Sequence, residues 1–206
     1  MDLKTNNKEQ LILEVAEKLF IEKGYTGTKT TEIADNAGVN HALLHYYFRT
    51  KENLFNKIFE QKAAHLLSSF SFTVDDDFSF FDKLKEGIEF HFDFLRKTPK
   101  LPLFILREIV SNKERKAYIF KNLFPVGKEL FQKFNAVIDN EIRKGAIRPV
   151  KATDLLLNIL SLNVFSFVAA QVFFDMDSEE NQENIRVFLE ERKKNNVELI
   201  INSLKQ

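Results

Sequence analysis

Two histidines and two tyrosines stand close together in the segment from Asn40 to Lys51, NHALLHYYFRTK. His41 and His45 are four positions apart, a spacing that brings two imidazoles to one face of a helix and suits a metal ion. The string HALLH lacks the glutamate that follows the first histidine in zinc proteases, and no third ligand lies nearby, so we expect no metal. Imidazole and phenol groups also donate hydrogen bonds to phosphates and base edges, and we favour this use over a plain surface.

Residues 41–48 separate into two faces on a helical wheel. One side carries residues that would pack against neighbouring helices: Leu43, Leu44 and, less centrally, Tyr47 and Phe48. The other side carries uncharged residues, most of them able to form hydrogen bonds: His41, Ala42, His45 and Tyr46. This composition is unusual for a face that meets only solvent, so we expect it to enter a groove of a duplex.

Short helices with clear start signals must position this face. An apolar stripe predicts a helix from Lys8 to Lys23 that ends at Gly24. Three residues that commonly cap helix N-termini each precede a helical pattern: Thr30, Asn40 and Thr50. A helix, a tight turn at Gly38 and a second short helix form the helix-turn-helix arrangement, whose second helix lies in the major groove.

The net charge of the whole chain does not indicate nucleic-acid binding, because 30 Lys and Arg balance 30 Asp and Glu over the 206 residues. Residues 1–60 contain 8 Lys and Arg against 9 Asp and Glu, which is a net charge of −1. However, the segment between Asp35 and Glu52 contains no acidic residue and contains two basic ones, Arg49 and Lys51. A local surface without acids can meet phosphate even on a neutral domain.

Little in the sequence points to an enzyme, the competing class. There is no cysteine, which excludes disulfides, thiolate zinc sites and cysteine nucleophiles. The glycine-rich nucleotide-binding motifs and the G-x-S-x-G motif are absent as well. We expect a non-enzyme without a cofactor.

The polar start MDLKTNNKEQ has no apolar signal core, so we also expect a cytoplasmic protein.

Helical periodicity recurs along nearly the whole chain, and we predict an all-α protein. Beyond residue 60, we predict helices over 78–97, 102–111, 114–144 with a break near Pro125, 153–174 and 183–204. The stretch from Leu155 to Phe174 has no charge and is long enough to span a membrane. Five polar residues interrupt it and acids flank it, so a buried helix is the better interpretation.

Residues Lys8–Phe59 resemble the DNA-binding domain of the tetracycline-repressor (TetR) family. The resemblance rests on the run ILEVAEKLFIEKGYTGTKTTEIADNAGVN and on the string HYYFRTKENLF. It implies a three-helix DNA-binding head at 1–60, a larger helical ligand-binding and dimerisation domain at 61–206, and a homodimer. Residue by residue, it implies a helix-turn-helix at Lys29–Phe48 and DNA contacts at Thr30, Asn40, His41, Ala42, His45, Tyr46, Tyr47 and Lys51.

The second domain holds 18 of the 22 phenylalanines. Aromatic residues at helical spacing usually form a core, but they can also line an apolar pocket between helices. As a pocket set we name His91, Phe94, Phe131, Asn163 and Phe167. His91 and Asn163 would orient a ligand there, or would be hydrogen-bonded core groups.

The helices at about 153–174 and 183–204 form the expected dimer surface, since two such helices from each subunit make a four-helix bundle. A buried helix within one monomer is the alternative. Together these features predict a DNA-binding transcriptional regulator. The family's common mode further implies a repressor of a palindromic operator, released by a small apolar or aromatic molecule. An activator and a protein-interaction module are the alternatives.

Overall fold

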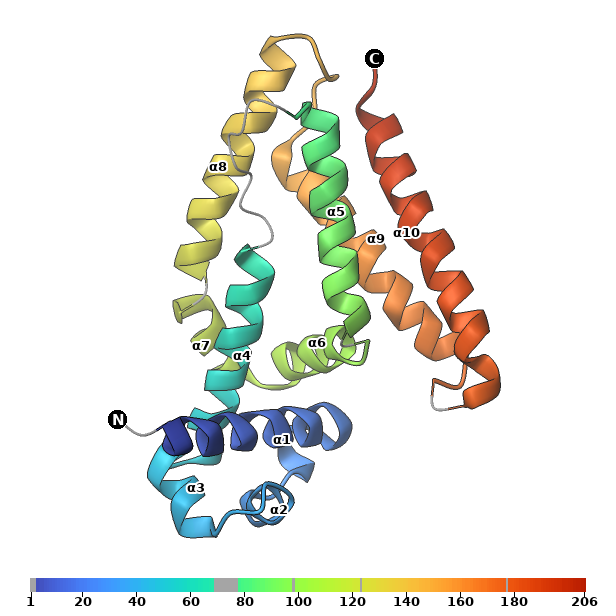
Figure 1. The fold of residues 1–206 in the computed structure, drawn as a ribbon. Helices are drawn as coiled ribbons and strands as arrows, with labels where there is room; N and C mark the ends of the chain where they lie inside the picture. The colour runs from blue at the N-terminus through green and yellow to red at the C-terminus, as the bar shows by residue number, and fades with distance from the viewer. Residues whose placement is uncertain (1–2, 69–77, 98, 123, 177) are drawn as a thin grey trace. The chain divides into compact units, whose positions relative to one another are not determined.

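The computed structural model describes residues 3–68, 78–97, 99–122, 124–176 and 178–206, and these residues form helices and connecting turns without a strand (Figure 1). The predicted all-α fold is confirmed. The helices, in chain order, are α1 (Leu3–Gly27), α2 (Thr30–Asn36), α3 (His41–Phe48), α4 (Lys51–Ser68), α5 (Phe80–Lys97), α6 (Leu101–Ser111), α7 (Lys113–Asn122), α8 (Phe124–Arg143), α9 (Ala152–Phe173) and α10 (Gln182–Leu204), with a 3₁₀ turn at Glu179–Asn181 before α10.

The chain divides into two compact units. The first unit, called the head below, comprises residues 1–65 and 104–117. The second unit, called the body, comprises residues 66–103 and 118–206. The head therefore contains most of α6 and part of α7 in addition to the helices up to α4.

The head is built on the apolar stripe of α1. Ile12, Ala16 and Phe20 are buried, and so are Ile33 of α2 and Leu44 of α3. α1 packs against both α2 and α3, which pack against each other. The stripe predicted from the sequence is thus the face that holds the two short helices in place.

The predicted end of the first helix is confirmed at Gly24, where φ is 71° and ψ is 170°. A positive φ of this size favours glycine, which has no Cβ to clash with the backbone. The chain turns here, and a short helical stretch continues to Gly27 before α2 begins.

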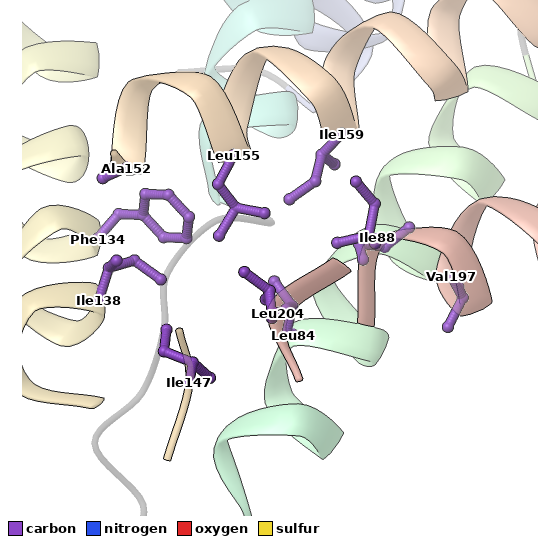
Figure 2. Close-up of a cluster of buried hydrophobic side chains, with 11 residues drawn as sticks. Leu84, Ile88, Phe134, Ile138, Ile147, Ala152, Leu155, Ile159, Val197 and Leu204 are labelled. Carbon is purple, nitrogen blue, oxygen red and sulfur yellow. The ribbon is translucent and has the colours of Figure 1, made fainter. Parts of the chain in front are cut away.

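The body is organised by packing among α5, α9 and α10, with α8 also contacting α9. Apolar side chains from all four helices and the α8–α9 connection form one buried cluster (Figure 2): Leu84, Ile88, Phe134, Ile138, Ile147, Ala152, Leu155, Ile159, Val197, Ile200 and Leu204. Their spacing of three, four or seven positions within each helix is that of a single buried stripe.

α7 ends at Asn122 and α8 begins at Phe124. The break predicted near Pro125 falls at residue 123, which lies outside the described residues, so it stays a prediction.

Helix α9 is, among the described residues, the one helix long and apolar enough to cross a membrane by length and composition. It packs against α5 and α10, and its centre holds the buried, hydrogen-bonded Asn163. One face of α9 is thus part of the core of the body, whereas Leu157, Phe165, Val172 and Phe173 on the same helix are exposed, so the predicted burial holds for only part of the helix.

Candidate nucleic-acid interface

Helix α3 presents the two faces expected from the sequence. Leu44 and Phe48 are buried in the head, and Leu43 and Tyr47 are half-buried. The opposite face is exposed and consists of His41, Ala42, His45 and Tyr46. Tyr46 is the most prominent of these, with 76% of its surface exposed. An aromatic side chain this exposed contributes little to the core of the head, so its position on α3 is better explained by contact with another molecule.

Two of the three predicted helix caps are confirmed. The Asn40 side-chain oxygen accepts a hydrogen bond from the Leu43 N–H at 2.8 Å, and the Thr50 hydroxyl accepts one from the Asn53 N–H at 3.0 Å. Each bond satisfies one of the backbone donors that a helix start leaves unpaired.

The prediction that Thr30 caps α2 is wrong. α2 begins at Thr30 itself, Lys29 occupies the cap position, and no side chain makes a capping bond there. A residue already inside the helix points its hydroxyl away from the first-turn N–H groups. The Thr30 hydroxyl lies instead 3.0 Å from His41 Nε2, which links the start of α2 to the start of α3.

The turn between α2 and α3 closes as the sequence indicates. The Gly38 N–H donates to Asp35 O at 3.1 Å and the Val39 N–H donates to Ala34 O at 3.0 Å. Gly38 has φ 61°, so this is the glycine-terminated motif common at helix C-termini. It fixes the angle at which α3 leaves α2.

The turn between α3 and α4 holds a feature that sequence reasoning missed. Arg49 has φ 59° and ψ −48°, and the Thr50 N–H donates to Phe48 O at 2.6 Å. This is a γ-turn with positive φ, a strained conformation for any residue but glycine. Arg49 is exposed and follows directly on α3. No sequence signal marks an arginine for such a turn.

Lys51, in the first turn of α4, has partners within the head. Its ammonium donates to Tyr25 O at 2.8 Å and to Thr28 O at 2.9 Å, and lies 4.2 Å from the centroid of the Tyr25 ring. The helix dipole disfavours a cation at this end of a helix. The two carbonyls and the ring face offset that cost.

The residues named for a ligand pocket lie in the body, and four of them are buried: His91, Phe94, Asn163 and Phe167. The Asn163 amide donates to His91 Nδ1 and to Ile88 O, each at 3.0 Å, and the Asn163 oxygen accepts from Asn196. Phe167 packs on Phe92, with ring centroids 4.8 Å apart. Phe131 packs on the edge of the apolar cluster.

Burial lowers the pKa of His91 to about 4, because desolvation penalises the charged imidazolium. Since Nδ1 accepts a hydrogen bond from Asn163, the neutral ring carries its proton on Nε2. The body therefore contains a neutral histidine joined by hydrogen bonds to an amide network, at the place where α5, α9 and α10 meet.

A groove of about 470 Å³ lies elsewhere on the body, between α5 and α10. Its lining contains none of the predicted pocket residues and is mostly charged: Lys85, Glu89, Glu190, Lys193, Lys194, Glu198 and Lys205 contribute to it.

Comparison with known proteins identifies the head. Residues 12–58, which include all of α2 and α3, match the family model described as bacterial regulatory proteins, tetR family. The chain is also 46% identical over 52 residues to the HTH-type transcriptional regulator QacR of Staphylococcus aureus, an alignment that covers 25% of this chain and 28% of QacR. The head is a tetR-family DNA-binding domain.

The similarity extends beyond the head at lower identity. The chain is 26% identical over 143 residues to the nucleoid occlusion factor SlmA of Mannheimia succiniciproducens, which covers 69% of this chain and 66% of SlmA. The fold of the chain is similar to that of FadR, a transcriptional regulator from Bacillus subtilis solved in complex with stearoyl-CoA. The TM-score is 0.69 at 18% identity, with 94% of this chain and 98% of FadR covered.

A head of this family is that of a helix-turn-helix transcriptional regulator. Its relatives are named as transcriptional regulators, which are typically not enzymes. A family of DNA-binding regulators also implies a cytoplasmic location.

Proposed function

We propose that this tetR-family regulator is a repressor that binds a palindromic operator as a homodimer and is released by a small apolar or aromatic molecule. The observation that carries the proposal is the outward face of α3. It is uncharged, rich in aromatic and imidazole rings, and exposed, while the opposite face of the same helix is buried in the head. Because this face is uncharged, removing it from water costs little free energy, and its polar groups can form hydrogen bonds in a major groove.

The proposed DNA contacts are those named from the sequence. Residues at the start of α3 approach the base edges, and Tyr46 lies one turn further along the same face. Lys51 stays in this set because it lies in the first turn of α4, where helix N–H groups can bind a phosphate, although its side chain also donates to Tyr25 O and Thr28 O. The full set is Thr30, Asn40, His41, Ala42, His45, Tyr46, Tyr47 and Lys51.

The proposed dimer uses α9 and α10, at about 153–174 and 183–204. Apolar side chains lie exposed along both helices: Leu157, Phe165, Val172 and Phe173 on α9, and Val187 and Leu199 on α10. Phe165 is 66% exposed and Val172 is 73% exposed. Covering these side chains with the same helices of a second copy would bury apolar surface and complete a four-helix bundle.

The effector is proposed to bind in the body. FadR, a structural relative, was crystallised with stearoyl-CoA, and the body of the present chain is rich in phenylalanine. His91, Phe94, Phe131, Asn163 and Phe167 are the first residues to test. A ligand that uses His91 or Asn163 must replace hydrogen bonds that each already makes. It releases DNA only if it binds the DNA-incompetent state more tightly than the competent one.

Selection of bound fragments from random duplex DNA tests the proposal. A palindromic consensus is expected, with half-sites separated by about one helical turn, roughly 34–36 Å, or somewhat more. The pair His45→Ala and Tyr46→Ala, both exposed on α3, should abolish retention of the selected duplex. Lys18→Ala, an exposed substitution on α1, should not.

Apolar and aromatic compounds are then screened for release of the selected duplex. Unchanged binding by the α3 variant would show that another surface binds DNA. A folded protein that selects no duplex at low salt would favour the protein-interaction module. Activation instead of repression would appear in a promoter assay as higher transcription with the bound protein.

A further inference from the structure

We infer that Glu108 of α6 is a positioning residue for DNA binding. It holds in place the chain between the kink of α1 and the start of α2, residues 24–28, which is called the corner below, by accepting a hydrogen bond from the Tyr25 N–H. All the residues involved belong to the head, so the contact is internal to that unit. The inference rests on the proposed binding of DNA by α3.

Glu108 is an acid in an unusual place. Only 7% of its surface is exposed, and its Oε1 lies 3.3 Å from the Tyr25 nitrogen. A buried carboxylate is costly unless polar partners compensate, so the burial of Glu108 indicates a defined contact. The positive φ of Gly24 turns the chain immediately before this N–H.

Lys51 binds the same residue from the other end. Its ammonium donates to the Tyr25 carbonyl at 2.8 Å and lies over the Tyr25 ring, while Glu108 accepts from the Tyr25 N–H. A carboxylate and an ammonium thus bind the two polar groups of one peptide residue. Charge-assisted hydrogen bonds are stronger than neutral ones, so the Tyr25 backbone has little freedom.

A second residue of α6 reinforces the contact. Phe104 is one turn before Glu108 on the same face of α6, and its ring centroid lies 5.7 Å from that of Phe55. The Phe55 ring in turn lies 5.3 Å from the Tyr25 ring at an interplanar angle of 89°. α6 therefore contacts the corner through both an apolar and a charged side chain.

The corner determines how the reading helix is presented. The Lys51 ammonium also binds Thr28 O, two residues before α2 begins at Thr30. The Thr30 hydroxyl lies 3.0 Å from His41 Nε2 at the start of α3. A displacement of the corner would therefore tilt α2 and α3, and small misorientation is enough to lose base contacts.

The sign of the change in DNA affinity distinguishes a positioning role of Glu108 from simple repulsion between its carboxylate and phosphate. Removing an acid from a DNA-binding unit should strengthen binding, because phosphate repels carboxylate. Loss of the Glu108 contact should instead weaken binding. Glu114→Gln is the matched control, since Glu114 is an exposed acid of the same unit, six positions further on.

The first measurement is the affinity of the full-length chain for the duplex selected above. Glu108→Ala should lose about tenfold in affinity, the equivalent of one charged hydrogen bond. Glu108→Gln keeps an oxygen that can accept a hydrogen bond from the Tyr25 N–H, so this variant should fold and its loss of affinity should be smaller than that of Glu108→Ala. The slope of log affinity against log salt should not change, because no phosphate contact is removed; a lost phosphate contact would lower it by about 0.9.

The second measurement needs no DNA. Hydrogen exchange at the Tyr25 amide should be faster in Glu108→Ala than in Glu114→Gln, while amides around Ile12 and Ala16 in α1 stay protected. Unchanged exchange at Tyr25, or a Glu108→Ala variant that binds the duplex as tightly as Glu114→Gln, would overturn the inference. If the unaltered chain binds no duplex, the proposed function fails, and the exchange result alone decides whether Glu108 holds the corner.

Discussion

The hydrogen-bonded His91 makes the stability of the body sensitive to mild acid. The ring is 1% exposed and neutral, and its Nδ1 accepts from the Asn163 amide. A proton on Nδ1 would place two donors face to face in an apolar setting. The folded state therefore resists protonation and lowers the pKa of His91 to about 4, whereas the unfolded chain takes up the proton near the ordinary histidine pKa of 6.5.

The size of the effect follows from the difference between the two pKa values. Above pH 6.5 neither state is protonated and the stability is complete; below it the unfolded state alone gains a proton until the pH reaches about 4. A difference of about 2.5 in pKa corresponds to about 3.4 kcal/mol at the acid limit. At pH 5 the loss is about 2 kcal/mol.

Urea denaturation at several pH values between 7.5 and 4.5 measures this loss. Because carboxylates also titrate towards the acid end, the informative quantity is the difference between the unaltered chain and His91→Gln, whose side chain does not titrate. The variant should be less stable at pH 7 but lose less stability on acidification. Phe94→Leu is the control: it destabilises the same buried helix and should keep the full pH dependence. Parallel curves for the unaltered chain and His91→Gln would refute the reasoning.

Three further predictions concern the dimer and the head. Phe165→Glu places a charge on the exposed face of α9 and should convert the protein from a dimer to a folded monomer, measured by light scattering after gel filtration. Gly24→Ala should destabilise the head by about 1–2 kcal/mol in thermal unfolding, because φ 71° disfavours a Cβ. The Cβ itself would meet only Glu108 Oε1 at 3.9 Å, so strain and not a clash is the cause. Arg49→Gly should stabilise the head by up to about 1 kcal/mol while weakening affinity for the selected duplex, since it removes strain and a cation together.

Local signals in the sequence predicted the structure around α3 well. The two faces of α3, the caps at Asn40 and Thr50, and the glycine turn at Gly38 all depend on residues within a few positions of one another. Thr30 failed as a cap because a threonine before a helix and one inside its first turn look the same in the sequence.

Contacts between distant residues were not predictable in the same way. Glu108 and Tyr25 are 83 positions apart, and His91 and Asn163 are 72 apart. Nothing in a single sequence pairs them. The sequence did mark His91 and Asn163 as polar residues among apolar ones, but it left open whether they orient a ligand or are hydrogen-bonded core groups. In the folded body they are hydrogen-bonded to each other.

The charge of the head bears on how the proposed regulator reaches specificity. The head, residues 1–65 and 104–117, contains 13 Lys and Arg against 11 Asp and Glu, which is a net charge of +2. The outward face of α3 has no Asp, Glu, Lys or Arg, and the cations that flank α2 and α3 in the chain are Lys29, Arg49 and Lys51, the last already bound to two carbonyls. Few phosphates can then be neutralised by residues beside α3, so these residues contribute little to non-specific binding. Most of the affinity for an operator would come from the fit of α3 to base edges. The proposed mechanism requires that α3 be held rigidly and presented twice. The contacts at Tyr25 would supply the first condition, and a dimer formed through the exposed faces of α9 and α10 would supply the second.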